Sequence, residues 1–129
     1  MTGVQTCALP ISTPADLDHL EAVNARLLTQ ANVDDAARHD FAFHEALVTL
    51  AQNRTLLTNY RLLQPVITQI MRVGKAARPV QIDTHQTHRA IIAALKARDR
   101  VAYAYLLSRH LEYGLQFVGP ETARSARTG

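Results

Sequence analysis

Four side chains that are able to bind a metal ion occupy matching positions in expected helices of this chain. Asp40 and His44 stand four residues apart. An α-helix returns to the same face after three or four residues, so their carboxylate and imidazole groups point the same way. His88 and His110 each lie on the apolar stripe of a later segment, and buried polar groups need partners. One ion bound by all four residues would satisfy them together.

The expected cofactor is one divalent ion. Asp and His ligands suit Zn, Ni, Fe or Mn, and they leave room for water or for a carboxylate ligand. Which of these metals binds stays open at this point. Ordinary roles also stay open: Asp40 as a solvated residue, His44 hydrogen-bonded to a carbonyl, and the other two histidines half-exposed.

Composition favours a helical scaffold to position these groups. The chain has 129 residues, of which 47% are hydrophobic and 19% charged, as in a single globular domain. It contains only five Gly and five Pro, and no clean alternation of β-branched with polar residues. We therefore predict an all-α fold of about five helices.

Capping and breaking residues place these helices. Ser12 or Thr13 should cap the first, whose apolar face runs from Leu17 to Leu28. The third should kink at Pro65 and stop at Gly74. A loop from 74 to 81 should follow it. The second helix should run from the break at 32–34 to about 52, the third from about 55 to 73, the fourth from a cap at Asp83 or Thr84 to Ala97, and the fifth from a cap at Asp99 to about 117.

Charge and cysteine content exclude little. The net charge is +3 and the pI about 9.4, but the basic residues are scattered, which is weak evidence for any partner. A single cysteine, Cys7, cannot form an internal disulfide. No apolar run reaches membrane length, and no signal peptide is recognisable. We expect a cytoplasmic protein with no membrane partner.

The first eleven residues resemble the conceptual translation of a sequencing adapter. We therefore expect residues 1–12 to be a non-native or disordered leader and the chain to be the downstream part of a longer gene. Residues 13–118 should form the folded domain, and 119–129 a disordered tail with too little apolar surface to fold.

In the order of its motifs, the chain resembles the FCD domain, the ligand-binding half of FadR-type regulators in the GntR superfamily. The resemblance covers roughly residues 14–117. It rests on Asp40-Phe41-Ala42-Phe43-His44, similar to the family's "D, any three, H" helix, and on Ala51-Gln52-Asn53, His88-Arg89-Ala90-Ile91, Ala94-Leu95, Arg98-Asp99, Ala104 and His110-Leu111.

This resemblance implies an antiparallel helical bundle around a divalent metal, with Asp40, His44, His88 and His110 at the family's ligand positions. It also implies a sensor, not an enzyme, whose partner is a small carboxylate metabolite. DNA would be a partner only through an amino-terminal winged helix-turn-helix, which nothing in the chain resembles. We also expect the first family helix to be missing, and a second copy of the chain, as a homodimer, is a candidate partner.

Three further residues are candidates for binding the ligand. Asn53 follows a helix end, where an Asn is also a common cap. Arg38 lies beside the helix of Asp40, where it would hold an anion or remain solvated. His85 precedes His88 by three residues, a spacing that also allows chelation.

Three other function classes are alternatives to the sensor. A metal-dependent hydrolase would use the same ligands, but Val48 stands where the zinc-protease motif has its second His. A ferritin-like di-iron bundle needs Glu-x-x-His pairs, which do not occur in the sequence. A plain helical interaction module with structural histidines remains the third alternative.

Overall fold

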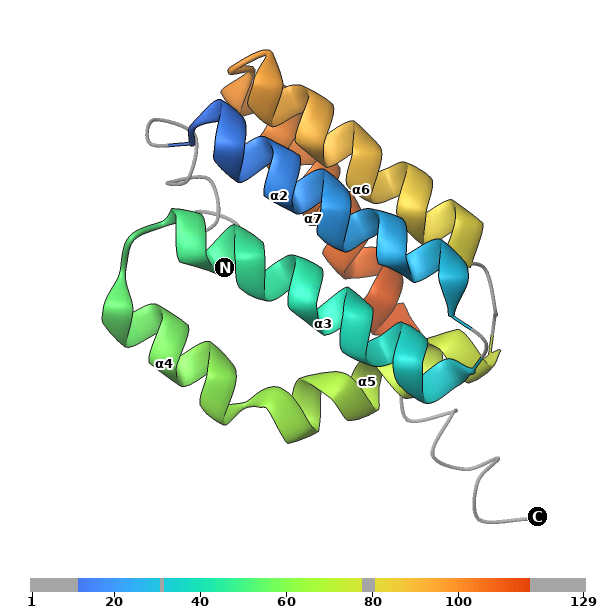
Figure 1. Cartoon of the computed structure of the whole chain (residues 1–129). Coiled ribbons are helices and arrows are strands. Elements are labelled where there is room, and N and C mark those ends of the chain that lie inside the picture. Colours follow the sequence, from blue (N-terminus) through green and yellow to red (C-terminus); the bar gives the residue numbers. More distant parts are fainter. Residues whose placement is uncertain (1–11, 31, 78–80, 117–129) are drawn as a thin grey trace, which may run out of the picture.

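The computed structural model describes residues 12–30, 32–77 and 81–116, and every regular element in these ranges is helical (Figure 1). The elements are α2 (Pro14–Ala25), the 3-10 turn η2 (Arg26–Thr29), α3 (Val33–Leu50), α4 (Arg54–Leu62), α5 (Gln64–Ala77), α6 (Gln81–Lys96) and α7 (Arg100–Leu115). The prediction of an all-α fold is confirmed. The predicted leader and tail lie outside the described residues, apart from Ser12.

Side-chain caps begin four of the helices. Thr13 caps α2 through a reciprocal pair with Asp16: the Asp16 N–H donates to Thr13 Oγ1 (3.2 Å), and the Thr13 N–H donates to Asp16 Oδ2 (2.8 Å). Asn32, Asn53 and Asp99 accept from backbone N–H groups in the same way. Each oxygen satisfies an N–H that has no partner within the helix. The predicted cap at Asp99 is confirmed.

The predicted third helix is wrong in its continuity. A single kinked helix was expected from about 55 to 73, but the structure has two helices, α4 and α5, that are separated at Leu63. Pro65 is the second residue of α5. Pro65 has no N–H to donate to the Arg61 carbonyl and its ring clashes with that carbonyl, so α4 cannot continue through it, whereas the first turn of a new helix accepts proline.

The predicted loop from 74 to 81 is also wrong where it can be seen. α5 continues through Gly74 to Ala77, and α6 already begins at Gln81. A glycine inside a helix costs about 1 kcal/mol relative to alanine. Burial of Lys75 in an ion pair with α3 opposes that cost. Asp83 does not cap α6 but lies in its first turn, where a carboxylate suits the helix dipole.

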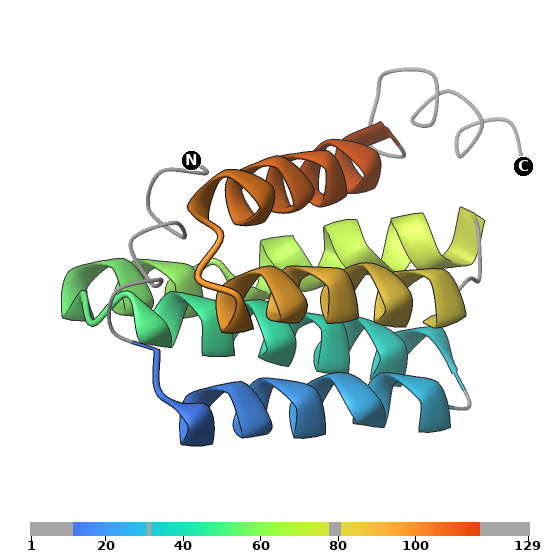
Figure 2. The same cartoon turned by 90° about the horizontal axis from the view of Figure 1, so that it is seen from above.

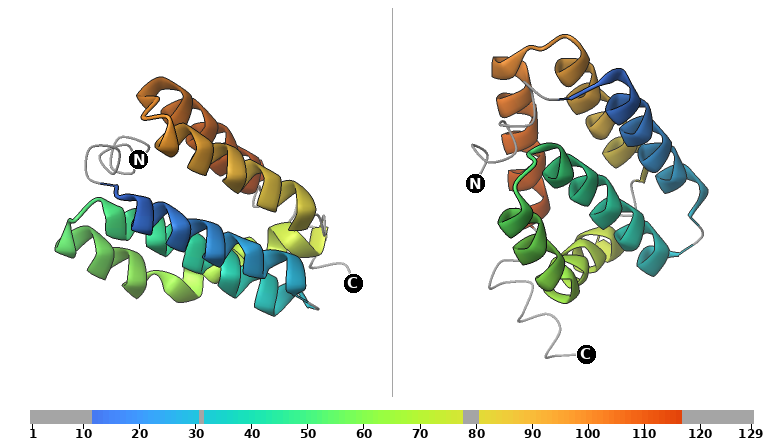
Figure 3. Two further views of the ribbon diagram at one scale, coloured as in Figure 1. Left: turned by 45° about the horizontal axis from the view of Figure 1, so that its top comes forward. Right: turned by 60° about the vertical axis from the view of Figure 1, so that its left-hand side comes forward.

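Five helices form a closed ring around the core. α2 contacts α3, α3 contacts α5, α5 contacts α7, α7 contacts α6, and α6 returns to α2. Figure 3 shows this ring, and Figure 2 shows that α2, α3, α5, α6 and α7 alternate in direction along the chain, so that among the ring neighbours α5 and α7 run the same way and the other pairs are antiparallel. α4 packs against α3 and α5. The fold is therefore an antiparallel bundle.

The core fills the space between α2, α3, α6 and α7. Its apolar members include Leu20, Val23, Phe43, Leu47, Ile91, Ile92, Leu95, Tyr103 and Leu107. Leu28, which was predicted to face the core, is 49% exposed because η2 winds more tightly than an α-helix and turns it outward.

Candidate metal centre

The four nominated ligands converge on one point. One ligand atom from each of Asp40, His44, His88 and His110 lies within 4.8 Å of all the others, and we call these four residues the Asp–His cluster. α3 supplies the first two from its middle, α6 supplies His88 and α7 supplies His110. His88 is fully buried, Asp40 and His44 are nearly so, and His110 is half-buried.

The four ligand atoms make a ring of short contacts. Asp40 Oδ1 lies 3.5 Å from His44 Nε2 and 3.4 Å from His88 Nε2. His110 Nε2 lies 3.2 Å from His44 Nε2 and 3.1 Å from His88 Nε2. The three imidazole rings thus point their Nε2 atoms into the same small space. The distances to Asp40 are too long for hydrogen bonds.

Asp40 divides its two oxygens between different neighbours. Oδ2 accepts from the ammonium of Lys75 on α5 at 2.8 Å. Oδ1 is buried without a hydrogen-bond partner among the described residues. Burial alone would raise the pKa of Asp40, but His44, His88 and Lys75 outweigh it and hold this pKa well below its usual value. Asp40 is therefore a carboxylate with one oxygen left over.

Two of the histidines are held neutral. Burial lowers the pKa of His88 to about 4, although Asp40 opposes this shift. Burial, with the neighbouring His44 and His88, lowers the pKa of His110 to about 3. A neutral imidazole has a lone pair on one nitrogen, which is the form that binds metals.

Two residues of the site were missed by sequence reasoning. Asn24 on α2 is buried, and its Oδ1 lies 3.0 Å from His88 Nδ1. Its signal was available, because a lone polar residue lies on the apolar face of α2 beside Leu20 and Val23. Lys75 has no such signal, because the glycine before it predicts the end of the preceding helix.

The three lesser candidates have other contacts in the structure. Asn53 caps α4, with its Oδ1 accepting from the Leu56 N–H at 3.0 Å. Arg38 is exposed and pairs with Asp35. His85 is outside the Asp–His cluster, and its carbonyl accepts from the Asn24 amide at 3.0 Å. Ligand binding by these three stays a prediction.

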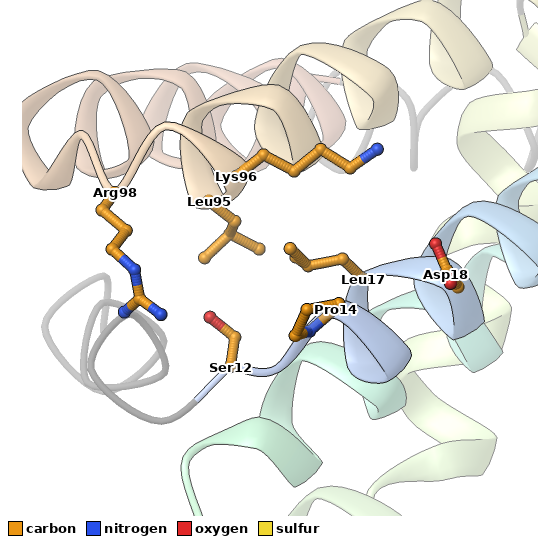
Figure 4. Close-up of a pocket in the computed structure, with 7 residues that line it drawn as sticks. All are labelled: Ser12, Pro14, Leu17, Asp18, Leu95, Lys96 and Arg98. Carbon is orange, nitrogen blue, oxygen red and sulfur yellow. The ribbon is translucent and has the colours of Figure 1, made fainter.

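A separate groove of about 280 Å³ lies between the start of α2 and the end of α6 (Figure 4). Its lining includes Leu17, Leu95 and Arg98, and no member of the Asp–His cluster lines it.

In the described part of the chain, no helix combines the length and apolar character needed to cross a membrane.

Comparison with known proteins adds one match. Residues 4–113 match the family model described as the FCD domain. Among proteins with curated descriptions, none matches this chain closely enough to serve as a relative.

Proposed function

Because this chain belongs to the FCD domain family, the effector-binding domains of GntR-family regulators, we propose that its Asp–His cluster binds one divalent metal ion and that a small organic acid binds at this ion. FCD domains are regulatory ligand-binding domains. The proposed role of the chain is therefore to sense a metabolite rather than to transform it.

The single observation that carries the metal proposal is the spacing of the ligand atoms. Nitrogen ligands at about 2.1 Å from an ion lie about 3.0 Å apart at right angles and about 3.4 Å apart at tetrahedral angles. The four neighbour distances around the cluster range from 3.1 to 3.5 Å, and all the ligand atoms lie within 4.8 Å of one another. The unpartnered Oδ1 of Asp40 supports the same proposal, because a buried carboxylate oxygen needs a partner.

Charge supports an acid as the ligand. Asp40 and Lys75 form an ion pair, and the neutral forms of His88 and His110 add no charge. A divalent ion would then give the site a net positive charge within a largely buried space. Such a site favours an anion, and a carboxylate oxygen is a good ligand for Zn, Ni, Fe or Mn.

The proposed output is control of DNA binding through a winged helix-turn-helix domain. An acid that binds one packing of the ring better than another shifts the population toward that packing. DNA would thus be an indirect partner, and the protein would act in the cytoplasm.

Metal content tests the proposal directly. We expect about one ion per chain after reconstitution, and none in the Asp40→Ala, His44→Ala double variant. The matched control is Asp18→Ala, His19→Ala, which removes the same residue types from the exposed side of α2. Equal metal content in all three proteins, or none in any, would contradict the proposal. A thermal-shift screen of small carboxylic acids with the loaded protein then tests for the ligand.

A further inference from the structure

The orientation of the Asn24 side chain follows from two contacts. Its Nδ2 lies 3.0 Å from the His85 carbonyl oxygen, and its Oδ1 lies 3.0 Å from His88 Nδ1. The flipped amide would bring Oδ1 against the carbonyl oxygen, and two acceptors repel each other. The hydrogen-bond network therefore assigns the oxygen of Asn24 to His88.

This orientation determines where the proton of His88 resides. An amide oxygen only accepts hydrogen bonds, so His88 Nδ1 must carry the hydrogen that it donates. In the neutral ring, Nε2 then has the lone pair. Nε2 is the atom that lies 3.4 Å from Asp40 Oδ1 and 3.1 Å from His110 Nε2.

Phe43 holds the plane of the same ring. Its ring stacks on that of His88 with centroids 3.8 Å apart and planes inclined by 8°. Stacking restricts tilting of the imidazole, while rotation within its plane is restricted by the hydrogen bond to Asn24. Both restraints lie in the interior, because Asn24 is 1% exposed and His88 is 0% exposed.

We infer that Asn24 is a positioning residue: it sets the tautomer of His88 and so presents the Nε2 lone pair to the Asp–His cluster. The consequence for metal binding rests on the proposed function, but the tautomer does not. Partners of this kind around a metal-binding histidine change metal affinity by about 10-fold to 100-fold when they are lost. α2 thus takes part in the site although it supplies no ligand.

The tautomer is measured first, by long-range proton–nitrogen NMR correlation of the histidine rings in metal-free wild-type protein. We expect the His88 proton on Nδ1. We expect Asn24→Leu to shift this proton toward Nε2, whereas Asn24→Asp, which keeps an acceptor, should leave it on Nδ1. A proton on Nε2 in the wild type would overturn the inference without the use of any variant.

Titration with Zn²⁺ alone provides the second readout. Asn24→Leu should bind at least 10-fold more weakly than wild type, and Asn24→Asp should recover most of this loss. Val23→Ala is the matched control, because it thins the buried face of α2 beside Asn24 without removing a hydrogen-bond partner of His88. If Val23→Ala weakened binding as much as Asn24→Leu, the effect would be one of packing and the inference would be wrong.

The two proposals fail in different ways. A chain that binds no metal, but in which Asn24→Leu moves the His88 proton, would support the positioning role and contradict the metal site. A chain that binds metal equally well with Leu at position 24 would contradict the positioning role alone.

Discussion

Lowering the pH from 8 to 5 in the presence of a chelator should cost the metal-free protein about 4 kcal/mol of stability through His88 and His110. Their pKa values are about 4 and about 3 in the folded chain. In the unfolded chain, a histidine titrates near about 6.5. The unfolded state therefore binds more protons throughout this range, and stability falls as the pH falls.

The magnitude follows from these values. At pH 5, protonation stabilises each unfolded histidine by RT ln(1 + 10^1.5), about 2 kcal/mol, while the folded side chains remain mostly neutral. At pH 8 the contribution vanishes. Asp40 does not contribute in this window. Its pKa is lowered in the folded chain, so the stability that it adds is fully present above the pKa of an unfolded aspartate, about 3.9, and is lost only at lower pH.

Urea unfolding followed by far-UV circular dichroism at pH 8, 7, 6 and 5 measures this loss. His88→Gln should reduce the loss to about 2 kcal/mol, since one of the two titrating groups is gone. His19→Gln, on the exposed side of α2, should leave it unchanged. A loss below about 1 kcal/mol in wild type, or an equal loss in His88→Gln, would refute the depressed pKa values.

Three further predictions concern the same structure. Lys75→Met should destabilise the protein by about 3 kcal/mol in the presence of a chelator, because it leaves Asp40 buried without its counter-ion. The loss should be much smaller in saturating Zn²⁺, and equal losses in urea unfolding under both conditions would contradict this. His44→Ala or His110→Ala should lower both the affinity for zinc, measured by calorimetry, and the rise in Tm that zinc causes. A wild-type Tm that neither zinc nor chelator changes would refute this. Asn53→Ala should cost about 1 kcal/mol in urea unfolding and leave zinc affinity unchanged, because Asn53 caps α4.

Local spacing explains what could be predicted. Asp40 and His44 share one helix, so helical periodicity alone aligns them. Thr13 and Asp99 cap their helices through contacts three residues away, which are equally visible in the sequence. The convergence of His88 and His110 on α3 depends on helix packing. That part was predicted from the apolar stripes that carry both histidines and from the family resemblance, and the cluster geometry agrees with it.

Tertiary contacts explain what could not be predicted. Gly74 is a common helix stop, yet α5 continues past it and Lys75 reaches Asp40 from there. No local pattern contains that ion pair. Asn24 lies on an apolar stripe, which marks it as a buried polar residue that needs a partner, but its partner lies 64 positions away. The sequence predicted a kink at Pro65 where the structure has a break at Leu63. Whether a proline bends a helix or ends it depends on what the two segments pack against, which the sequence does not show.

The closed ring has a consequence for how the chain is made. His44 and His110 meet across 66 positions of sequence, and Asn24 and His88 across 64. A ribosome releases the amino-terminal helices first, so the emerging chain holds Asp40 and His44 long before α7 exists. Contacts of such long range are slow to form, because loop closure precedes any gain from them. Because α7 supplies His110, its synthesis completes the cluster, and a chain that stops before position 110 is left with an incomplete ligand set.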